Sequence, residues 1–385
     1  MTTVPFIDFV GQYRTLAPEL EAAVAEVLAS GNYILGKRVA AFEEALAKRS
    51  GCQFGIGVNS GTDALELALR ACGIGPSDEV IVPAFTFMAT ALAVTSLGAT
   101  PVMADIDEDS YGIDVRDAAR RITRKTKAII PVHLYGQPCD LEGVLELARR
   151  HHLQVIEDCA QAIGATYKGR PVGSFGQVGC FSFYPTKNLG AAGDGGAVVT
   201  NDRAVAERIA LQRNYGTRDK ISYRAFGRNT RLDELQAAIL SVKLQHLDDW
   251  NEARRRRAGW YRELFAQEAV EGVGLPVELA DRRHVYHLFV VRVKERDRVQ
   301  RDLAARGVHT MVHYARPLHV DSLYDGRPGH AEKLPRAERA AREVLSLPLY
   351  PELSREAVST VIQELKGVVR AGVGRARSVG GKSSR

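Results

Sequence analysis

A carboxylate and an amine at the ends of two predicted strands are the residues of this chain best suited to chemistry. The apolar stretch around Ile156 predicts a buried strand that ends on Asp158, and residues 178–183 predict a second strand that ends near Lys187. A lysine can hold an aldehyde as a Schiff base, and an aspartate can keep a pyridine nitrogen protonated. The pair therefore points to a pyridoxal phosphate (PLP) enzyme.

A lone aspartate or lysine at a strand end is more often a cap or a solvated charge, so the neighbouring residues must decide. Gln161 follows Asp158 by three residues, where it can reach the phenolic oxygen of PLP, and Ser182 precedes Lys187 by five, where it can bind phosphate. Residues 190–196 are rich in glycine, which permits close backbone approach to a ligand. These features favour the cofactor site.

The elements that must position these residues follow an alternating pattern. Two amphipathic helices are expected first, over residues 16–28 and 39–47, and further helices over 62–72, 86–96 and 141–150. Between them lie short β-branched stretches at residues 79–83, 100–104, 128–132 and 154–157. Strands of nearly continuous apolar character are buried on both faces, which indicates a mostly parallel sheet under helices.

The pattern changes after a long helix predicted over residues 235–249. Strands at 287–293 and 308–314 and helices at 297–306 and 355–369 indicate a small α+β domain. We therefore predict an N-terminal segment and large PLP-binding domain over residues 1–245 and a small C-terminal domain over 246–370. The basic, Gly/Ser-rich residues 371–385 are expected to form a disordered tail.

Several ordered motifs resemble those of the DegT/DnrJ/EryC1/StrS family of PLP-dependent nucleotide-sugar aminotransferases. They are residues 59–65 (NSGTDAL), 82–87 (VPAFTF), 157–161 (EDCAQ), 182–190 (SFYPTKNLG) and 228–238 (RNTRLDELQAA). The resemblance covers roughly residues 4–368, and the motifs together are highly specific. It implies the aspartate aminotransferase type I fold, an α/β fold with a mostly parallel seven-stranded sheet in the large domain and a smaller α+β C-terminal domain.

The cofactor contacts follow from the residues and this resemblance together. Gly61 and Thr62 open a helix after a strand, where backbone N–H groups and the helix dipole favour a phosphate, although a plain helix cap is the alternative. The resemblance adds Ser182 to the phosphate site and makes Phe87 an aromatic ring stacked on PLP, whereas alone Phe87 reads equally well as a core residue.

Two catalytic residues are expected. Asp158 pairs with the pyridine nitrogen and raises its pKa, while Gln161 lies beside the phenolate oxygen. Lys187 binds the cofactor aldehyde and then moves a proton as base and acid. Some family members are sugar dehydratases with histidine at this position, and Lys187 argues against that branch.

The remaining site residues are implied by the resemblance alone. Asn229 is expected to cross a homodimer interface to the partner's PLP phosphate, so that active sites are shared, and Arg231 to shape the sugar site. His313, Tyr314 and His319 are expected to contact the sugar or diphosphate. Without the resemblance these residues would be assigned to loops and a strand end.

Composition places the chain among ordinary soluble globular proteins. Hydrophobic residues make up 45% and charged residues 25% of its 385 residues, enough for two domains. We see neither a membrane span nor a secretion signal, and the five cysteines contain no CxxC pair. We therefore expect free thiols in a reducing cytoplasm, no metal site and no membrane partner.

The formal charge of +6 raises the question of nucleic acid. The excess lies in the run Arg254–Arg257, within a helical stretch, and in the C-terminal tail, and no aromatic residues alternate with it. A solvated helix face and a loose tail are the expected interpretation, with no nucleic-acid partner.

The predicted reaction is transfer of an amino group from L-glutamate to C-3 of a nucleotide-linked keto-deoxyhexose, a dTDP- or UDP-3-keto sugar. By resemblance, Asn188 and Asp194 depart from the branch of the family that aminates C-4, which tends to carry histidine and a Gly-Glu-Gly turn there. The alternatives are a C-4 keto-sugar or keto-inositol aminotransferase, or a non-catalytic PLP-fold regulatory protein.

Overall fold

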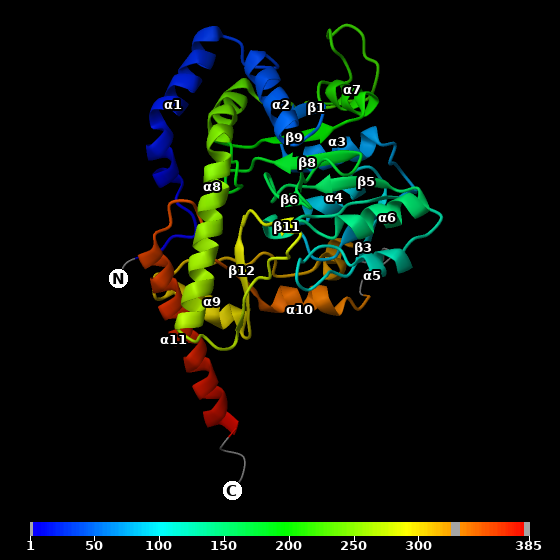
Figure 1. The fold of residues 1–385 in the computed structure, drawn as a ribbon. Coiled ribbons are helices and arrows are strands. Elements are labelled where there is room, and N and C mark those ends of the chain that lie inside the picture. Colours follow the sequence, from blue (N-terminus) through cyan, green and yellow to red (C-terminus); the bar gives the residue numbers. More distant parts are fainter. Residues whose placement is uncertain (1–2, 325–331, 381–385) are drawn as a thin grey trace.

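A seven-stranded sheet forms the centre of the larger part of the molecule in this computed structural model, which describes residues 3–324 and 332–380 (Figure 1). The strand order is β1-β9-β8-β5-β4-β2-β3. Their bounds are β1 Phe54–Val58, β2 Glu79–Pro83, β3 Thr100–Ala104, β4 Thr126–Ile129, β5 Gln154–Asp158, β8 Val178–Ser182 and β9 Gly196–Thr200. Only β9 within this sheet is antiparallel to its neighbours, so the mostly parallel α/β sheet is confirmed.

Helices cover both faces of this sheet. They are α1 Phe9–Ser30, α2 Lys37–Arg49, α3 Gly61–Ala71, α4 Ala89–Thr95, α5 Val115–Arg120, α6 Leu141–His151, α7 Arg203–Gln212 and α8 Glu234–Gln267. Alternate residues of one strand reach different cores, because side chains of a strand point to opposite faces. In β8, Cys180 packs in the core that contains α3, whereas Phe181 packs in the core that contains α2 and α8.

The parallel pairing of β5 and β8 places their carboxyl ends at one edge of the sheet. Asp158 is in register with Cys180, two residues before Ser182. The strand β2 ends at the same edge and leads into the segment that carries Phe87. Ligands of open α/β sheets bind outside the carboxyl ends of the strands, so this edge is where a site is expected.

The smaller part of the molecule is built on a second sheet, ordered β10-β12-β13. Its elements are β10 Val273–Gly274, β12 Phe289–Val293, α9 Arg296–Ala304, α10 Pro335–Glu343, β13 Val344–Leu347 and α11 Arg355–Gly380. A third, short sheet joins β6 Thr166–Tyr167, β7 Arg170–Pro171 and β11 Arg282–Arg283. Val4, in the predicted N-terminal segment, packs in the core of the smaller part and bridges to Val308.

The helix α8 is much longer than predicted and runs from the larger part of the molecule into the smaller part (Figure 1). It runs through the predicted boundary at residues 245 and 246. Buried apolar residues continue along it, with Leu247 in the core around α2 and Tyr261 in the core of the smaller part. The arginine run inside it is a solvated face only in part, because Arg256 is exposed but Arg254 is buried.

Two further differences concern the C-terminal part. Residues 308–314 do not form the predicted strand: Val308 and Met311 make only isolated bridges there, and β12 pairs with β10 and β13. The helix α11 continues to Gly380, through positions where a disordered tail was expected, while residues 381–385 lie outside the described residues. Along the described chain, none of the helices is long and apolar enough to cross a membrane.

Candidate active site

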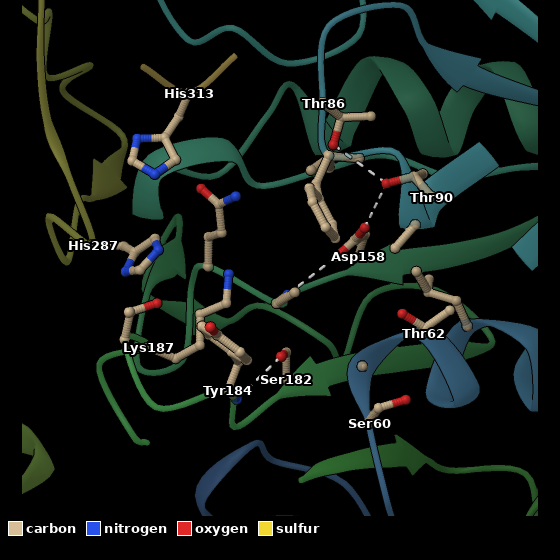
Figure 2. A pocket seen from close by; sticks show the side chains of 18 of the residues that line it. Ser60, Thr62, Thr86, Thr90, Asp158, Ser182, Tyr184, Lys187, His287 and His313 are labelled. Atoms are coloured by element: carbon tan, nitrogen blue, oxygen red, sulfur yellow. Dashed lines mark hydrogen bonds between the residues drawn. The ribbon is translucent and has the colours of Figure 1, made fainter. Parts of the chain in front are cut away.

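A cavity of about 410 Å³ lies at the carboxyl edge of the large sheet (Figure 2). Of the residues predicted from sequence, nine line it: Gly61, Thr62, Phe87, Asp158, Gln161, Ser182, Lys187, His313 and Tyr314. They come from α3, the β2–α4 connection, the ends of β5 and β8, and the segment after α9. Tertiary structure thus collects most of the predicted site into one pocket.

Asp158 is a buried carboxylate at the end of β5. Its Oδ2 accepts a hydrogen bond from Thr90 Oγ1 at 2.9 Å, and its Oδ1 accepts one from the Ala160 N–H at 3.1 Å. Burial raises the pKa of Asp158, and these two hydrogen bonds together with the charge of Lys187 oppose that rise. It has no salt bridge within residues 3–324 and 332–380, so the site offers a carboxylate that a buried cation would stabilise.

Lys187 lies across the pocket, in the turn after β8. Burial lowers the pKa of its amine to about 8, while Asp158 acts in the opposite direction. Desolvation disfavours the charged form, so a larger fraction of this amine is neutral near neutral pH than in an exposed lysine. A neutral amine is the form that attacks an aldehyde.

The N-terminus of α3 meets the end of β8 at one end of the pocket. Ser60 caps the helix by accepting a hydrogen bond from the Asp63 N–H at 3.1 Å, and Gly61 is its first residue. A Cβ at Gly61 would lie 2.6 Å from Ser182 Cβ, so glycine is needed for this close approach. Thr62, in the first turn of α3, and Ser182, at the end of β8, line this end of the pocket. Their hydroxyls and the N–H groups of the helix start suit a phosphate group.

Phe87 and Gln161 are the residues of the pocket that suit contact with a flat aromatic ligand. Phe87 is 57% exposed and lines the pocket, which argues against the alternative that it belongs to the core. Gln161 is held in place, because its Oε1 accepts from the Tyr135 N–H at 2.8 Å and its Nε2 donates to the Tyr314 hydroxyl at 3.0 Å. The rings of Phe87 and Tyr314 lie with centroids 5.8 Å apart.

The end of β5 is held by Glu157, which the sequence analysis did not single out. Its fully buried carboxylate accepts N–H groups from Gly173, Phe175 and Gly176 at 2.7–2.8 Å, and it pairs with His133 Nε2 at 3.1 Å. Cys159 lies within 4.8 Å of both. These bonds engage the Glu157 oxygens and tie the end of β5 to the connection between β7 and β8, which supports the orientation of Asp158.

Other pocket residues were also missed from sequence. They are Thr86 and Thr90, which lie near Asp158, Tyr184, which follows Ser182 by two residues, and His287, which precedes β12 (Figure 2). Tyr184 lies between Ser182 and Lys187 in the motif at residues 182–190, and this position could have indicated that it lines the pocket. The signal at His287 was a polar residue at the start of an apolar strand, which is weak because strands often begin that way.

Three predicted residues lie outside this pocket. Asn229 is exposed, and Arg231 donates to Asn214 Oδ1 at 2.9 Å and lies over the ring of Tyr215. His319 is fully buried and faces Glu338, with 3.5 Å between Nε2 and Oε1. In this structure the His319 side chain has no exposed surface and lies in the 3₁₀ turn Leu318–Val320 beside Glu338 of α10, so a contact with the substrate stays a prediction.

The residues present fit PLP. A buried carboxylate without a salt bridge in the described chain suits a pyridine nitrogen, a lysine whose amine is partly neutral suits an aldehyde, and the start of α3 suits a phosphate. Phe87 adds an exposed aromatic ring to the lining of the same pocket. Fold and site together define a PLP-dependent enzyme of the aspartate aminotransferase type.

Comparison with known proteins agrees with this class of enzyme. Residues 15–366 match the model of the DegT/DnrJ/EryC1/StrS aminotransferase family. The chain is 48% identical to dTDP-3-amino-3,4,6-trideoxy-alpha-D-glucose transaminase of Streptomyces venezuelae, over 94% of this chain and 95% of that protein. It is 45% identical to UDP-N-acetyl-3-dehydro-alpha-D-glucosamine 3-aminotransferase of Acidithiobacillus ferrooxidans, over 94% and 96% of the two chains.

A solved structure supports the fold as well. The crystal structure of S. venezuelae DesV in complex with a ketimine intermediate superposes with a TM-score of 0.92 at 48% identity, covering 95% of this chain and 98% of that one. The chain belongs to the DegT/DnrJ/EryC1/StrS aminotransferase family. It is accordingly a PLP-dependent aminotransferase, and the cofactor predicted from Asp158 and Lys187 is confirmed.

Replacing Asp158 by asparagine should damage catalysis more than folding. The amide keeps the shape of the carboxylate but cannot hold a pyridine nitrogen protonated, so we expect kcat to fall by about 10²-fold or more. Circular dichroism and the thermal midpoint should stay near those of the wild type. An unfolded variant would show instead that Asp158 is structural, and Thr90→Val serves as a control that removes only one hydrogen bond to it.

Covalent capture of PLP by the apoenzyme should depend on pH as the neutral fraction of Lys187 does. Its lowered pKa means that the rate should rise with pH and level off above about 8. An exposed lysine would keep gaining neutral amine up to about 10.4. Stopped-flow absorbance between pH 6.5 and 10 measures this, with Lys187→Ala as the variant without covalent capture; a rate still rising at pH 10 would contradict a desolvated amine.

Proposed function

We propose that this enzyme transfers the amino group of L-glutamate to C-3 of a nucleotide-linked keto-deoxyhexose, such as a dTDP- or UDP-3-keto sugar. The observation that carries the proposal is that the buried Asp158 and the half-buried Lys187 line one pocket in a chain whose two named relatives are both 3-amino-sugar enzymes. Asp194, which departs from the pattern of the C-4 branch, lines that pocket.

The chain's own residues have separable tasks in this reaction. When bound, PLP supplies an aldehyde that takes up the amino nitrogen and a ring that stabilises negative charge on the reacting carbon. Asp158 keeps the ring nitrogen protonated through its buried carboxylate. Lys187 takes a proton from the donor carbon and returns one to the acceptor, with Phe87 covering one face of the site. The start of α3, together with Ser182, holds the phosphate.

The active site in this proposal is shared between two subunits. Lys187 is the only lysine or arginine that lines the pocket within the described chain, yet a nucleotide diphosphate carries two negative charges. Asn229 and Arg231 lie outside the pocket beside a loop with large exposed apolar side chains, Ile221, Tyr223 and Phe226. In the proposed dimer, a two-fold axis buries this loop and places Asn229 and Arg231 at the partner's pocket, and the symmetry repeats the arrangement at the other pocket.

The cytoplasm is the proposed location, since all five cysteines are free in the structure and three of them are buried. A C-4 keto-sugar or keto-inositol acceptor is the second candidate. Asn188, the other residue that departs from the C-4 pattern, does not line the pocket, so the assignment to C-3 rests on Asp194 and on the relatives. A non-catalytic role would leave the Lys187–Asp158 arrangement without a task.

Assaying the purified holoenzyme against a panel of nucleotide-linked 3-keto and 4-keto sugars, with L-glutamate and other amino donors, tests the proposal. We expect formation of 2-oxoglutarate with 3-keto sugars at least about tenfold faster, in kcat/KM, than with 4-keto sugars. Faster turnover of 4-keto sugars or keto-inositols would support the second candidate. No turnover of any ketone, from an enzyme loaded with PLP, would support a regulatory protein.

The shared active site can be tested by mixing two inactive chains. Lys187→Ala is combined with the double variant Asn229→Ala, Arg231→Ala, and the subunits are exchanged by mild denaturation. In a mixed dimer, one site takes Lys187 from the second chain and Asn229 and Arg231 from the first, so random pairing should restore about a quarter of wild-type activity.

The matched control mixes Lys187→Ala with Asp158→Asn. Lys187 and Asp158 line the same pocket of one chain, so every site in such a mixture carries one lesion and no activity should return. Equal activity from both mixtures, or none from either, would contradict sharing.

A further inference from the structure

The imidazole of His287 is a buried polar group for which the reaction described so far has no use. Its residue is only 6% exposed, and its Nδ1 is buried without a hydrogen-bond partner in the described part of the chain. The ring nevertheless lines the active-site pocket. Nearly all buried polar side chains in proteins are hydrogen-bonded, so an unpaired imidazole nitrogen on a residue that lines a cavity requires an explanation, and a ligand in the cavity that engages this ring provides one.

Hydrogen bonds from neighbouring elements fix the backbone of the segment that carries His287. Arg254 Nη1, from α8, donates to the carbonyl oxygens of Tyr286, His287 and Leu349 at 3.3, 3.2 and 3.0 Å. Asn188 Nδ2, next to the catalytic lysine, donates to the Val285 carbonyl at 3.0 Å. These bonds fix the backbone of His287 to α8 and to the turn of Lys187 and leave its side chain for the pocket.

His287 lies on the Lys187 side of the pocket, beside His313 and away from the phosphate end at Ser60 and Thr62 (Figure 2). Burial lowers the pKa of His287 well below its usual range, and the positive charge of Lys187 lowers it further. The ring is therefore neutral without a ligand. A carboxylate against it would favour the protonated form and oppose both effects.

The positively charged residues of the pocket indicate which anionic group binds at His287. Apart from Lys187, the lining residues of the described chain that can carry positive charge are His287 and His313. His313 already pairs through Nδ1 with Ser346 Oγ at 2.8 Å. An amino-acid donor carries a carboxylate on its reacting carbon, which must come close to Lys187, whereas the diphosphate of a sugar nucleotide is separated from the reacting carbon by the sugar ring.

We propose that His287 binds the α-carboxylate of the amino donor and so selects an amino acid for the first half of the reaction. This assignment rests on the proposed function, since it needs an α-amino acid as donor. The assignment does not involve the sugar, so substitution of His287 should affect the half-reaction with the amino donor more than the half-reaction with the keto sugar. Arg254 acts as a positioning residue in this arrangement, because it contacts the backbone of His287 and does not line the pocket.

The test uses holoenzyme variants and a donor analogue that binds without reacting further, 2-methyl-L-glutamate, which has no α-hydrogen to lose. His287→Leu removes both ring nitrogens, and His287→Gln keeps one hydrogen-bond donor. Absorbance titration should give a Kd at least about tenfold higher for His287→Leu and a smaller rise for His287→Gln, since a lost hydrogen bond to a charged group has effects of this order. The KM for the keto sugar, measured from enzyme preloaded with pyridoxamine phosphate, should change less than about threefold.

His284→Leu is the matched control. This residue is another buried histidine of the same segment, but it stacks on Tyr286 with centroids 3.9 Å apart and does not line the pocket, so the Kd should not change. PLP content and the thermal midpoint are checked for each variant, and His287→Gln carries the test if His287→Leu loses its cofactor.

Two outcomes would overturn the assignment: an unchanged Kd in the His287 variants, or a larger effect on the keto-sugar half-reaction than on the donor. Wild-type enzyme that shows no spectral response to L-glutamate would instead contradict the proposed donor, and the role of His287 would fall with it.

Discussion

The buried carboxylate of Asp158 is the constraint on which the rest of the site depends. A charged group inside a protein is unfavourable unless a cation or hydrogen bonds compensate it. The structure provides two hydrogen bonds, from Thr90 and from the Ala160 N–H, and no salt bridge in the described chain. The carboxylate is thus held where the protonated ring nitrogen of PLP would complete its environment. Desolvation of the Lys187 amine in the same pocket lowers its pKa to about 8 and keeps it partly neutral.

The position of that carboxylate depends on a second one, directly before it in sequence. Glu157 points to the other face of β5, where it gathers three backbone N–H groups of residues 173–176 and the ring of His133. Adjacent residues of a strand point in opposite directions, so one carboxylate faces the ligand and the other anchors the loop. The dipeptide therefore combines a functional residue with the structural support that orients it.

The long helix α8 relates the two parts of the chain to each other. Asn251 bonds to Asn188 at 2.7 Å and to the Ile163 carbonyl at 3.1 Å, and Arg254 holds the backbone around His287. Polar groups of one continuous helix thus contact both the turn of the catalytic lysine and the segment that enters the pocket from the smaller part. Since an unpaired buried polar group is costly, these bonds favour a single relative position of the two segments.

Local patterns in the sequence determined much of this protein. The apolar runs of β2, β3 and β5 match their predicted ranges closely, and the motifs around Asp158 and Lys187 identified the cofactor and the family, because strand burial and motif spacing are local properties. The most useful clue was that several chemical groups followed strands whose ends meet at one edge of a parallel sheet.

Tertiary structure decided the rest. The length of α8, the burial of Arg254 and the absence of a strand at 308–314 depend on which distant segments pack against these residues. His319 and His287 show this most clearly, since both are histidines in apolar surroundings. One is enclosed beside Glu338 and the other faces the active site. Whether a side chain faces a cavity is a property of the folded chain, so residue type and spacing alone do not predict it.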